Sequence, residues 1–321
     1  MRYEKPIVLV HGGAGSFLGL SKDDLKKYRS CLKDAVSNGY NVIRRGSAVD
    51  AVVESVKTME DCEVMNAGKG SVLNLMGEIE MDAGVMDGKL FKAAGVALIK
   101  KIKNPILLAK IVLEKTDHVL LAGDFAEKLG LKNGLETLDE KYVSIKKERY
   151  RRLLKDFLEG KRFKHLSKLR SLIREWNIVM PDTVGAVALD SEGSLASATS
   201  TGGYWLKMPG RIGDSPVVGA GFYANKYAAA SATGIGEYIL MTMLCLRTVG
   251  YVEKGLTATE ASVKAIEYIT EVYGNDTAGI IVVDSKGFVG ASFNTRGMGR
   301  ALLAKNMLIA KVSIYANEQF I

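Results

Sequence analysis

The spacing of apolar and polar positions predicts short strands and helices in the first half of the chain. Residues 7–10 form an apolar, β-branched run that ends in the glycines of His11-Gly-Gly-Ala-Gly15, a pattern typical of a buried strand followed by a tight loop. Ser21 and Ser47 each stand three residues before an aspartate, as in a capping box, and apolar residues follow both at helical spacing. Periodic patterns also predict a strand and two further helices at residues 78–82, 105–114 and 124–129.

After Pro181 the pattern changes to pairs of short apolar strands. Residues 183–189 and 194–199 predict one hairpin, and residues 279–283 and 287–292 predict another. Strands joined by tight turns favour antiparallel sheets over a doubly wound parallel sheet.

Two further helices are expected in this half of the chain. Residues 219–236 are rich in small side chains and are expected to open a helix that continues to residue 246. Its apolar stretch, residues 238–246, is too short to span a bilayer and predicts a buried helix. Thr257 and Glu260 form the capping box of the other helix.

Composition places the chain among ordinary globular proteins. Its 321 residues are 47% hydrophobic and 25% charged, which suits one large domain or two smaller ones. The three cysteines Cys31, Cys62 and Cys245 are far apart and form no CxxC pair, so we expect no disulfide and a reducing cytosol. The first residues lack the apolar core of a signal peptide, which also predicts a cytoplasmic protein without membrane association.

The net charge of +8 comes from one segment. Residues 141–174 hold thirteen Lys or Arg and three Asp or Glu, so the rest of the chain is close to neutral. The same segment carries Phe163, Leu166, Leu169, Leu172 and Trp176 at helical spacing. A solvated basic helix is the favoured interpretation; it could also fold against the precursor, shield a site or contact an acidic partner. Its aromatic residues are not interleaved as in base-stacking surfaces, so we expect no specific nucleic-acid partner.

Several familiar site types do not fit the sequence. The three histidines, His11, His118 and His165, are not paired at metal-ligand spacing, which disfavours a zinc site or a serine–histidine triad. His11 follows an apolar strand, and a structural role is favoured over that of a base. The glycine-rich segments around Lys69 and Gly234 lack the remaining glycines of phosphate-binding and dinucleotide-binding loops.

A threonine stands at the first position of a predicted buried strand. Thr183 follows Pro181 and Asp182 at the end of the basic segment and opens Thr183-Val-Gly-Ala-Val-Ala-Leu-Asp190. Taken alone this has an ordinary explanation, because β-branched residues are common at strand starts.

Together, however, the segments resemble the plant-type (class 2) asparaginases and isoaspartyl peptidases, which are N-terminal nucleophile hydrolases. In the second half the resemblance rests on Thr183 to Asp190 together with Ala198-Thr-Ser-Thr-Gly-Gly203, Pro209-Gly-Arg-Ile-Gly-Asp-Ser-Pro216, Gly219-Ala-Gly-Phe-Tyr-Ala-Asn225, Ala232-Thr-Gly-Ile-Gly-Glu237 and Phe293-Asn-Thr-Arg-Gly-Met298. In the first half it rests on Val10-His-Gly-Gly-Ala-Gly15, Asn66-Ala-Gly-Lys-Gly70, Met81-Asp-Ala83 and Met86-Asp-Gly88. The motifs cover nearly the whole chain in the family's order.

The resemblance implies a fold and a maturation step. The expected fold is a single α/β domain, a four-layer αββα sandwich of two mainly antiparallel sheets flanked by helices. The expected precursor cuts itself between Asp182 and Thr183. Residues 1–182 would then form an alpha subunit, with a basic linker at about 133–182, and residues 183–321 a beta subunit that begins at the nucleophile.

This maturation explains why a threonine can act without histidine. A hydroxyl is a weak nucleophile at neutral pH and needs a neighbouring base. Once freed, the α-amine of Thr183 has a reference pKa of about 7.7–8.0, which suits a general base. The nucleophile and its base would then belong to one residue.

The resemblance also implies roles for other residues. Thr201 would hydrogen-bond the nucleophile, and Thr233 and Gly234 would form the oxyanion hole. Arg211 and Asp214 would hold the α-carboxylate and α-ammonium of an aspartyl substrate, with a backbone contact from Gly236. Taken alone, these residues would be explained by a turn cap, close helix packing and a surface ion pair.

The loop at residues 59–69 resembles the family's sodium-binding loop, while catalysis itself needs no cofactor. Asn66 would have a structural role. The expected sodium ligands are backbone carbonyls, those of Met59, Glu60, Cys62, Met65, Ala67 and Lys69. An ordinary glycine-rich turn would explain the loop equally well without a metal.

The expected activity is hydrolysis of L-asparagine and of β-aspartyl dipeptides through an acyl-enzyme. The expected assembly is a homodimer of processed units. Two alternatives stay open: a glycosylasparaginase-like hydrolase of glycosylated asparagine, and an uncleaved homologue without enzyme activity that binds through the basic helix.

Overall fold

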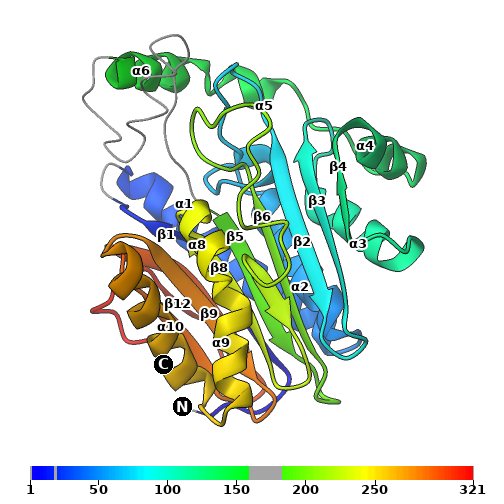
Figure 1. The fold of residues 1–321 in the computed structure, drawn as a ribbon, viewed down its shortest axis with the longest axis vertical. Coiled ribbons are helices and arrows are strands. Elements are labelled where there is room, and N and C mark those ends of the chain that lie inside the picture. The colour runs from blue at the N-terminus through cyan, green and yellow to red at the C-terminus, as the bar shows by residue number, and fades with distance from the viewer. Residues whose placement is uncertain (1, 18–19, 159–182, 321) are drawn as a thin grey trace.

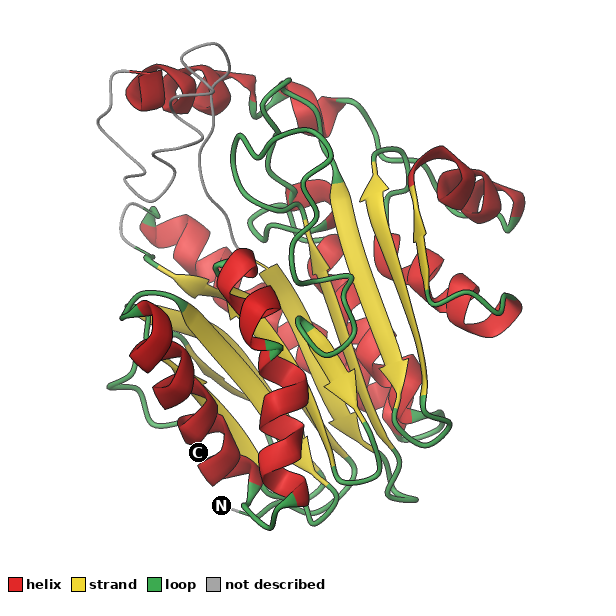
Figure 2. Ribbon diagram, viewed as in Figure 1, coloured by secondary structure: helices red, strands yellow, loops and turns green. Residues whose placement is uncertain are grey.

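A computed structural model describes residues 2–17, 20–158 and 183–320, and the structural statements below concern these residues. Two β-sheets lie face to face, and helices cover the outer face of each sheet (Figures 1 and 2). The expectation of two mainly antiparallel sheets flanked by helices is therefore confirmed.

The larger sheet has eight strands. One strand from the start of the chain lies between strands that come from after residue 182. In spatial order the strands are β12 Lys311–Ser313, β11 Gly297–Ala304, β1 Ile7–Gly15, β5 Thr183–Leu189, β6 Leu195–Thr201, β2 Met81–Asp87, β3 Lys92–Ile99 and β4 Leu120–Ala122. All neighbours are antiparallel except β3 and β4. The strand expected at residues 78–82 is shifted, because ladder pairing with β3 begins at Met81.

The smaller sheet has four antiparallel strands, in the order β10 Val289–Phe293, β9 Ala278–Asp284, β8 Ala228–Gly234 and β7 Phe222–Ala224. Its β9–β10 pair confirms the hairpin expected there. The prediction that residues 219–236 open a helix is wrong, because most of this run forms β7 and β8. Ala229 faces the other sheet, whereas Ala230 and Ala232 face the helices, so small side chains let all these layers approach closely.

Helices on the outer face of the larger sheet come from the first half of the chain. They are α1 Lys22–Ile43, α2 Ala48–Glu60, α3 Pro105–Lys115 and α4 Gly123–Lys132. A 3₁₀ turn at Gly68–Gly70 and the helices α5 Lys141–Ser144 and α6 Lys147–Leu158 complete this half, and α5 and α6 lie beyond the end of the sheets (Figure 1). The Ser47 hydroxyl accepts from the Asp50 N–H, and the Asp50 carboxylate accepts from the Ser47 N–H, which completes the predicted capping box. Ser21 likewise caps α1.

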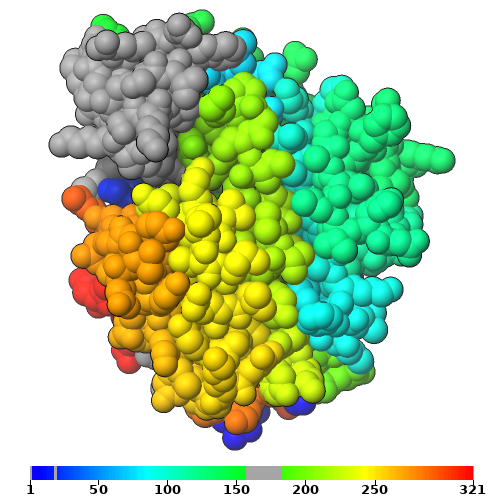
Figure 3. Space-filling view, viewed as in Figure 1, coloured from blue at the N-terminus to red at the C-terminus, as the bar shows by residue number. Residues whose placement is uncertain are grey.

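Three helices cover the smaller sheet: α8 Gly236–Thr242, α9 Leu244–Glu253 and α10 Ala258–Tyr273. In Figure 3 they form the yellow and orange face of the molecule. The prediction of one buried helix over residues 238–246 is wrong. Met243 has a left-handed backbone with φ of 46°, which separates α8 from α9, and the Met241 side chain is 77% exposed.

Three apolar layers hold this arrangement together, and β1 shows how. Val8 and Val10 pack against the helices of the larger sheet, while Ile7 and Leu9 pack between the two sheets. Successive side chains of a strand point to opposite faces, so a strand buried on both faces must be apolar at every position. No helix within the described ranges is both long and apolar enough to cross a membrane.

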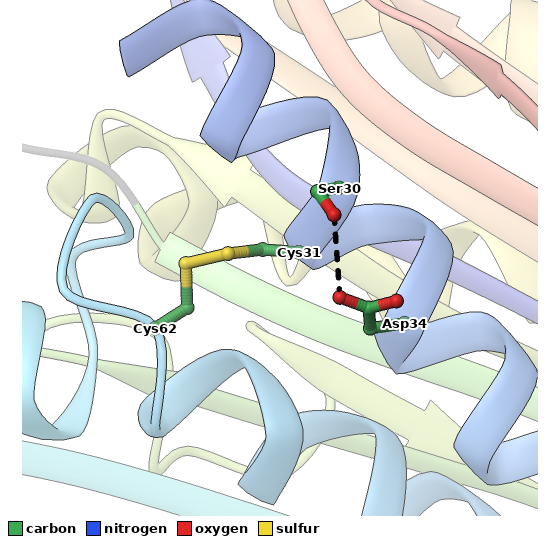
Figure 4. Close-up of a disulfide and its surroundings, with 4 residues drawn as sticks. All are labelled: Ser30, Cys31, Asp34 and Cys62. Atoms are coloured by element: carbon green, nitrogen blue, oxygen red, sulfur yellow. Dashed lines mark hydrogen bonds between the residues drawn. A yellow bond between two sulfur atoms is a disulfide. The ribbon is translucent and has the colours of Figure 1, made fainter. Parts of the chain in front are cut away.

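The expectation of no disulfide is wrong. Cys31 in α1 and Cys62 just after α2 form a disulfide across a Cα–Cα distance of 6.3 Å (Figure 4). The two helices pack side by side, which brings cysteines 31 residues apart in sequence into contact. Cys245 stays free and buried. The expectation of a reducing cytosol therefore loses the support that it drew from the cysteines.

Candidate active site

Two threonines face each other where β5 begins and β6 ends. Antiparallel pairing places Thr183 directly opposite Thr201. The Thr183 hydroxyl donates to Oγ1 of Thr201 at 3.2 Å, and the backbone N–H of Gly203 donates to the same oxygen at 3.0 Å. Thr183 is 6% exposed. Its preceding residue, Asp182, lies outside the described residues.

A third threonine, Thr233, is the penultimate residue of β8, a strand that packs against β5 from the other sheet. Thr233 Oγ1 accepts a hydrogen bond from the backbone N–H of Ala14 at 3.2 Å, so its hydroxyl proton remains available for another acceptor. Gly234 follows with φ of +140°, and a Cβ there would overlap the Thr277 carbonyl oxygen. Glycine is therefore required where the chain turns from β8 towards α8.

Arg211, Asp214 and Gly236 meet beside this strand end. A Cβ on Gly236 would lie 2.6 Å from Arg211 Nη2 and 2.8 Å from Asp214 Oδ1, so only a glycine leaves room for both groups. Arg211 and Asp214 come from a loop and Gly236 is the first residue of α8, and the fold brings the three together.

The guanidinium of Arg211 is held from two sides. Its Nε and Nη2 donate to the two carboxylate oxygens of Glu237, each at 3.0 Å, and its Cζ lies 4.4 Å from the centre of the Tyr204 ring. A guanidinium has five N–H donors, so this fork leaves donors for a second carboxylate.

Asp214 is a buried carboxyl group with an oxygen that has no hydrogen-bond partner, Oδ2. Burial raises the pKa of Asp214 to about 7, although the positive charge of Arg211 acts in the opposite direction. An ammonium group beside Oδ2 would favour the ionised form. The pair can thus present opposite charges to a ligand that carries both a carboxylate and an ammonium group.

His11 lies within β1 and is buried. Its Nε2 lies 2.9 Å from the Ser231 hydroxyl, and burial lowers the pKa of His11 to about 3. A neutral imidazole in this position fits the structural role expected for it and gives it no charge at neutral pH.

Sequence reasoning missed a buried charge pair beside the site. Lys207 and Asp82 are both completely buried, with Lys207 Nζ 3.8 Å from Asp82 Oδ2. Asp82 stands opposite Thr201 in the β2–β6 ladder, and Lys207 belongs to the loop that carries Arg211. Burial lowers the pKa of Lys207, and the Asp82 carboxylate counteracts this. The available signal was a lysine inside the apolar run Trp205-Leu-Lys-Met208.

Asn66 joins the first half of the chain to the end of β6. Its side-chain amide donates to the Gly203 carbonyl at 2.7 Å, and its Oδ1 accepts from the backbone N–H of Val72 at 2.9 Å. Its own carbonyl accepts from Gly202 at 3.0 Å. These bonds fix the turn that follows Thr201, which is compatible with the structural role expected for Asn66.

Several backbone carbonyls of the expected sodium loop lie close to Gly68 and Gly70. A Cβ at Gly68 would overlap the Glu60 carbonyl oxygen, and one at Gly70 would overlap that of Met65 and lie 2.9 Å from that of Cys62, so these carbonyls converge on the turn. Carbonyl oxygens in such a cradle fit a hard cation.

Most of the expected ligands of this loop already accept a hydrogen bond. The carbonyls of Met59, Cys62, Met65 and Ala67 each accept from a backbone N–H of the same loop, those of Cys62, Met65, Ala67 and Gly70 respectively. The Lys69 carbonyl accepts from Lys146 Nζ at 2.5 Å. The sodium assignment stays a prediction.

The start of the basic linker packs on the same part of the molecule. Burial lowers the pKa of Lys146 to about 8, and the Tyr150 hydroxyl of α6 donates to the Leu75 carbonyl at 2.7 Å. Leu153 is buried in the core under the larger sheet. The later apolar positions of the predicted amphipathic helix, from Phe163 to Trp176, lie outside the described residues.

Comparison with known proteins gives a consistent result. A family model described as asparaginase matches residues 4–312. The chain is 44% identical over 300 residues to the plant-type L-asparaginase of Pyrococcus furiosus, a match that covers 94% of this chain and 97% of that protein. It is 40% identical over 305 residues to the isoaspartyl peptidase/L-asparaginase of Danio rerio, covering 94% of each. The resemblance seen in the motifs is confirmed, and the chain belongs to the asparaginase family of hydrolases.

Proposed function

We propose that this protein cuts itself between Asp182 and Thr183 and then hydrolyses L-asparagine and β-aspartyl dipeptides through the freed threonine. The observation that carries the proposal is the position of Thr183 at the first residue of β5, with its hydroxyl bonded to Thr201. A cut before this residue would leave the hydroxyl in place and release an α-amine beside it.

The chemistry follows from the arrangement of the hydroxyl groups. The α-amine of Thr183 takes the proton from Oγ1, which attacks the side-chain carbonyl of the substrate. The developing oxyanion accepts from the free hydroxyl proton of Thr233 and the N–H of Gly234. The amine then returns the proton to the leaving nitrogen, and water hydrolyses the acyl-enzyme by the same route. Thr201 holds Oγ1 of the nucleophile in position throughout.

Substrate recognition uses the charged loop. The remaining donors of Arg211 bind the α-carboxylate, and Asp214 Oδ2 accepts from the α-ammonium. Gly236 leaves space for both. A substrate with both α groups free, as in asparagine and in β-aspartyl dipeptides, satisfies this pair of opposite charges.

The proposal includes the broader organisation expected of such a hydrolase. We assign the fold to the αββα type of N-terminal nucleophile hydrolases, with residues 1–182 and 183–321 as two subunits of one domain and a homodimer of processed units as the assembly. Sodium, when bound, would be held by backbone carbonyls of the loop at residues 59–69 and would brace the loop that carries Asn66. Catalysis itself uses no cofactor.

Intact mass spectrometry after prolonged incubation tests the proposal. We expect two fragments whose masses place the cut before Thr183, and one uncut chain without hydrolase activity for Thr183→Ala. Self-maturation of Thr183→Ala, or wild-type turnover by its uncut chain, would contradict the mechanism. A wild-type chain that never cleaves would support the non-enzymatic alternative, and turnover of glycosylated asparagine in preference to asparagine would support the glycosylasparaginase-like alternative.

A further inference from the structure

A cavity of about 490 Å³ lies beside Gly234. It is lined by the end of β1, by Gly234 and Ile235, and by two turns that contain Asp276, Thr277, Thr295 and Arg296. Pockets for small molecules usually have volumes of about 300–1,000 Å³. Its wall includes Gly234, which the proposed function places in the oxyanion hole, so a group that leaves the reacting carbonyl could enter it.

The two proposed substrates differ in what they release. Asparagine releases ammonia, which needs no cavity of this size. A β-aspartyl dipeptide releases a whole amino acid that carries a free α-carboxylate. The α groups of the aspartyl half are already accounted for by Arg211 and Asp214, so the cavity is available to the other half of the dipeptide.

Arg296 is the cationic residue of this wall. Both threonine hydroxyls are already used, because Thr277 Oγ1 donates to the Gly274 carbonyl at 3.1 Å and Thr295 Oγ1 donates to the Gly297 carbonyl at 2.9 Å. The Arg296 side chain is exposed, and no carboxylate among residues 2–17, 20–158 and 183–320 forms an ion pair with it. Its guanidinium fork therefore keeps all its donors for a ligand.

We propose that this cavity is the subsite for the leaving amino acid of β-aspartyl dipeptides, and that Arg296 binds its C-terminal carboxylate. The inference rests on the proposed function and extends it to the substrate class.

The test compares three substrates on the fully matured enzyme: L-asparagine, β-L-aspartyl-L-leucine and the C-terminal amide of that dipeptide. The wild-type enzyme should prefer the dipeptide acid to its amide. Arg296→Ala should lower kcat/KM for the acid on the order of tenfold to a hundredfold, the size of a lost charge-assisted interaction, and leave the amide and asparagine nearly unchanged. Arg296→Lys should keep part of the preference.

Arg45→Ala, which removes an exposed arginine at the end of α1, is the matched control and should change none of the three rates. An unchanged acid-to-amide ratio in Arg296→Ala, or an equal loss on all three substrates, would overturn the subsite. So would a wild-type enzyme that turns over asparagine but no dipeptide. A wild-type enzyme inactive on all three would instead refute the proposed function itself.

Discussion

The ends of β5, β6 and β8 and the neighbouring loop at residues 204–214 contribute different kinds of group to one site. At the strand ends, Thr183, Thr201 and Thr233 contribute neutral hydroxyls whose places are fixed by ladder pairing and backbone hydrogen bonds. The loop at residues 204–214 instead contributes charged groups, with Lys207 and Asp214 buried and Arg211 partly exposed.

The difference lies in what each region depends on. The positions of the hydroxyls depend on the register of the strands, and removing one surface charge does not change that register. The charges depend on partners from other elements, Asp82 of β2 for Lys207 and Glu237 of α8 for Arg211. We therefore expect the loop to be the region that responds to charge removal and to pH, as the following variants test.

The largest expected effect is on stability, from breaking the buried pair. Lys207→Met leaves the Asp82 carboxylate buried without its cation, and such a loss typically costs about 3–5 kcal/mol. Urea unfolding should be measured in a Thr183→Ala background, which on our mechanism remains a single chain.

The double variant Asp82→Asn with Lys207→Met serves as the control. Asparagine keeps an acceptor for the Leu98 N–H, which Asp82 Oδ1 now binds at 3.0 Å, while both charges are gone. Most of the lost stability should return. A double variant no more stable than Lys207→Met would show that the side-chain shape, not the charge pair, matters here.

Next in size is the loss of substrate binding in Arg211→Ala. A charge-assisted hydrogen bond contributes about 1.5–3 kcal/mol, so losing a two-bond fork should lower kcat/KM for β-aspartyl substrates on the order of a hundredfold or more. Self-cleavage should proceed normally, because the linker peptide has no free α groups. Self-cleavage and turnover should be assayed on one preparation. Glu237→Gln, which removes the carboxylate that holds Arg211, should give a smaller loss of kcat/KM than Arg211→Ala. Undiminished turnover would mean that the α-carboxylate is held elsewhere.

The smallest effect concerns pH. Because the pKa of Asp214 is raised to about 7, its ionised fraction rises with pH, and ammonium binding should strengthen. KM for asparagine should fall by roughly tenfold between pH 6 and 8, following that fraction. Asp214→Asn should raise KM and remove this slope, while the Thr183 amine continues to shape kcat. The same slope in Asp214→Asn would assign the titration to another group.

Part of the fold could be predicted from local patterns. The β5–β6 and β9–β10 hairpins have apolar runs around polar turns, and the caps of α1, α2 and α10 depend on residues three apart. Strand β8 could not be predicted, because alanine and serine have little strand preference and are selected here by the close approach of layers distant in sequence. The Cys31–Cys62 contact likewise depends on how α1 and α2 pack.

The site shows the same division. Motifs pointed to the threonines and to the loop with Arg211 and Asp214, and the fold places these residues where one ligand could contact them. Sequence spacing could not reveal that Glu237 forks with Arg211 or that Lys207 meets Asp82, because each pair joins separate elements. The expected cut and the roles drawn from resemblance remain predictions.

The strand order of the larger sheet has a mechanical consequence. β1, from before the proposed cut, lies between β11 and β5, which both come from after it. The disulfide does not join the two fragments, since both of its cysteines precede residue 182. A cut before Thr183 would thus divide the chain in the covalent sense alone. To separate the two fragments, the hydrogen bonds along both edges of β1 would have to break together. The cleaved protein should therefore migrate, bind ligands and unfold as one particle.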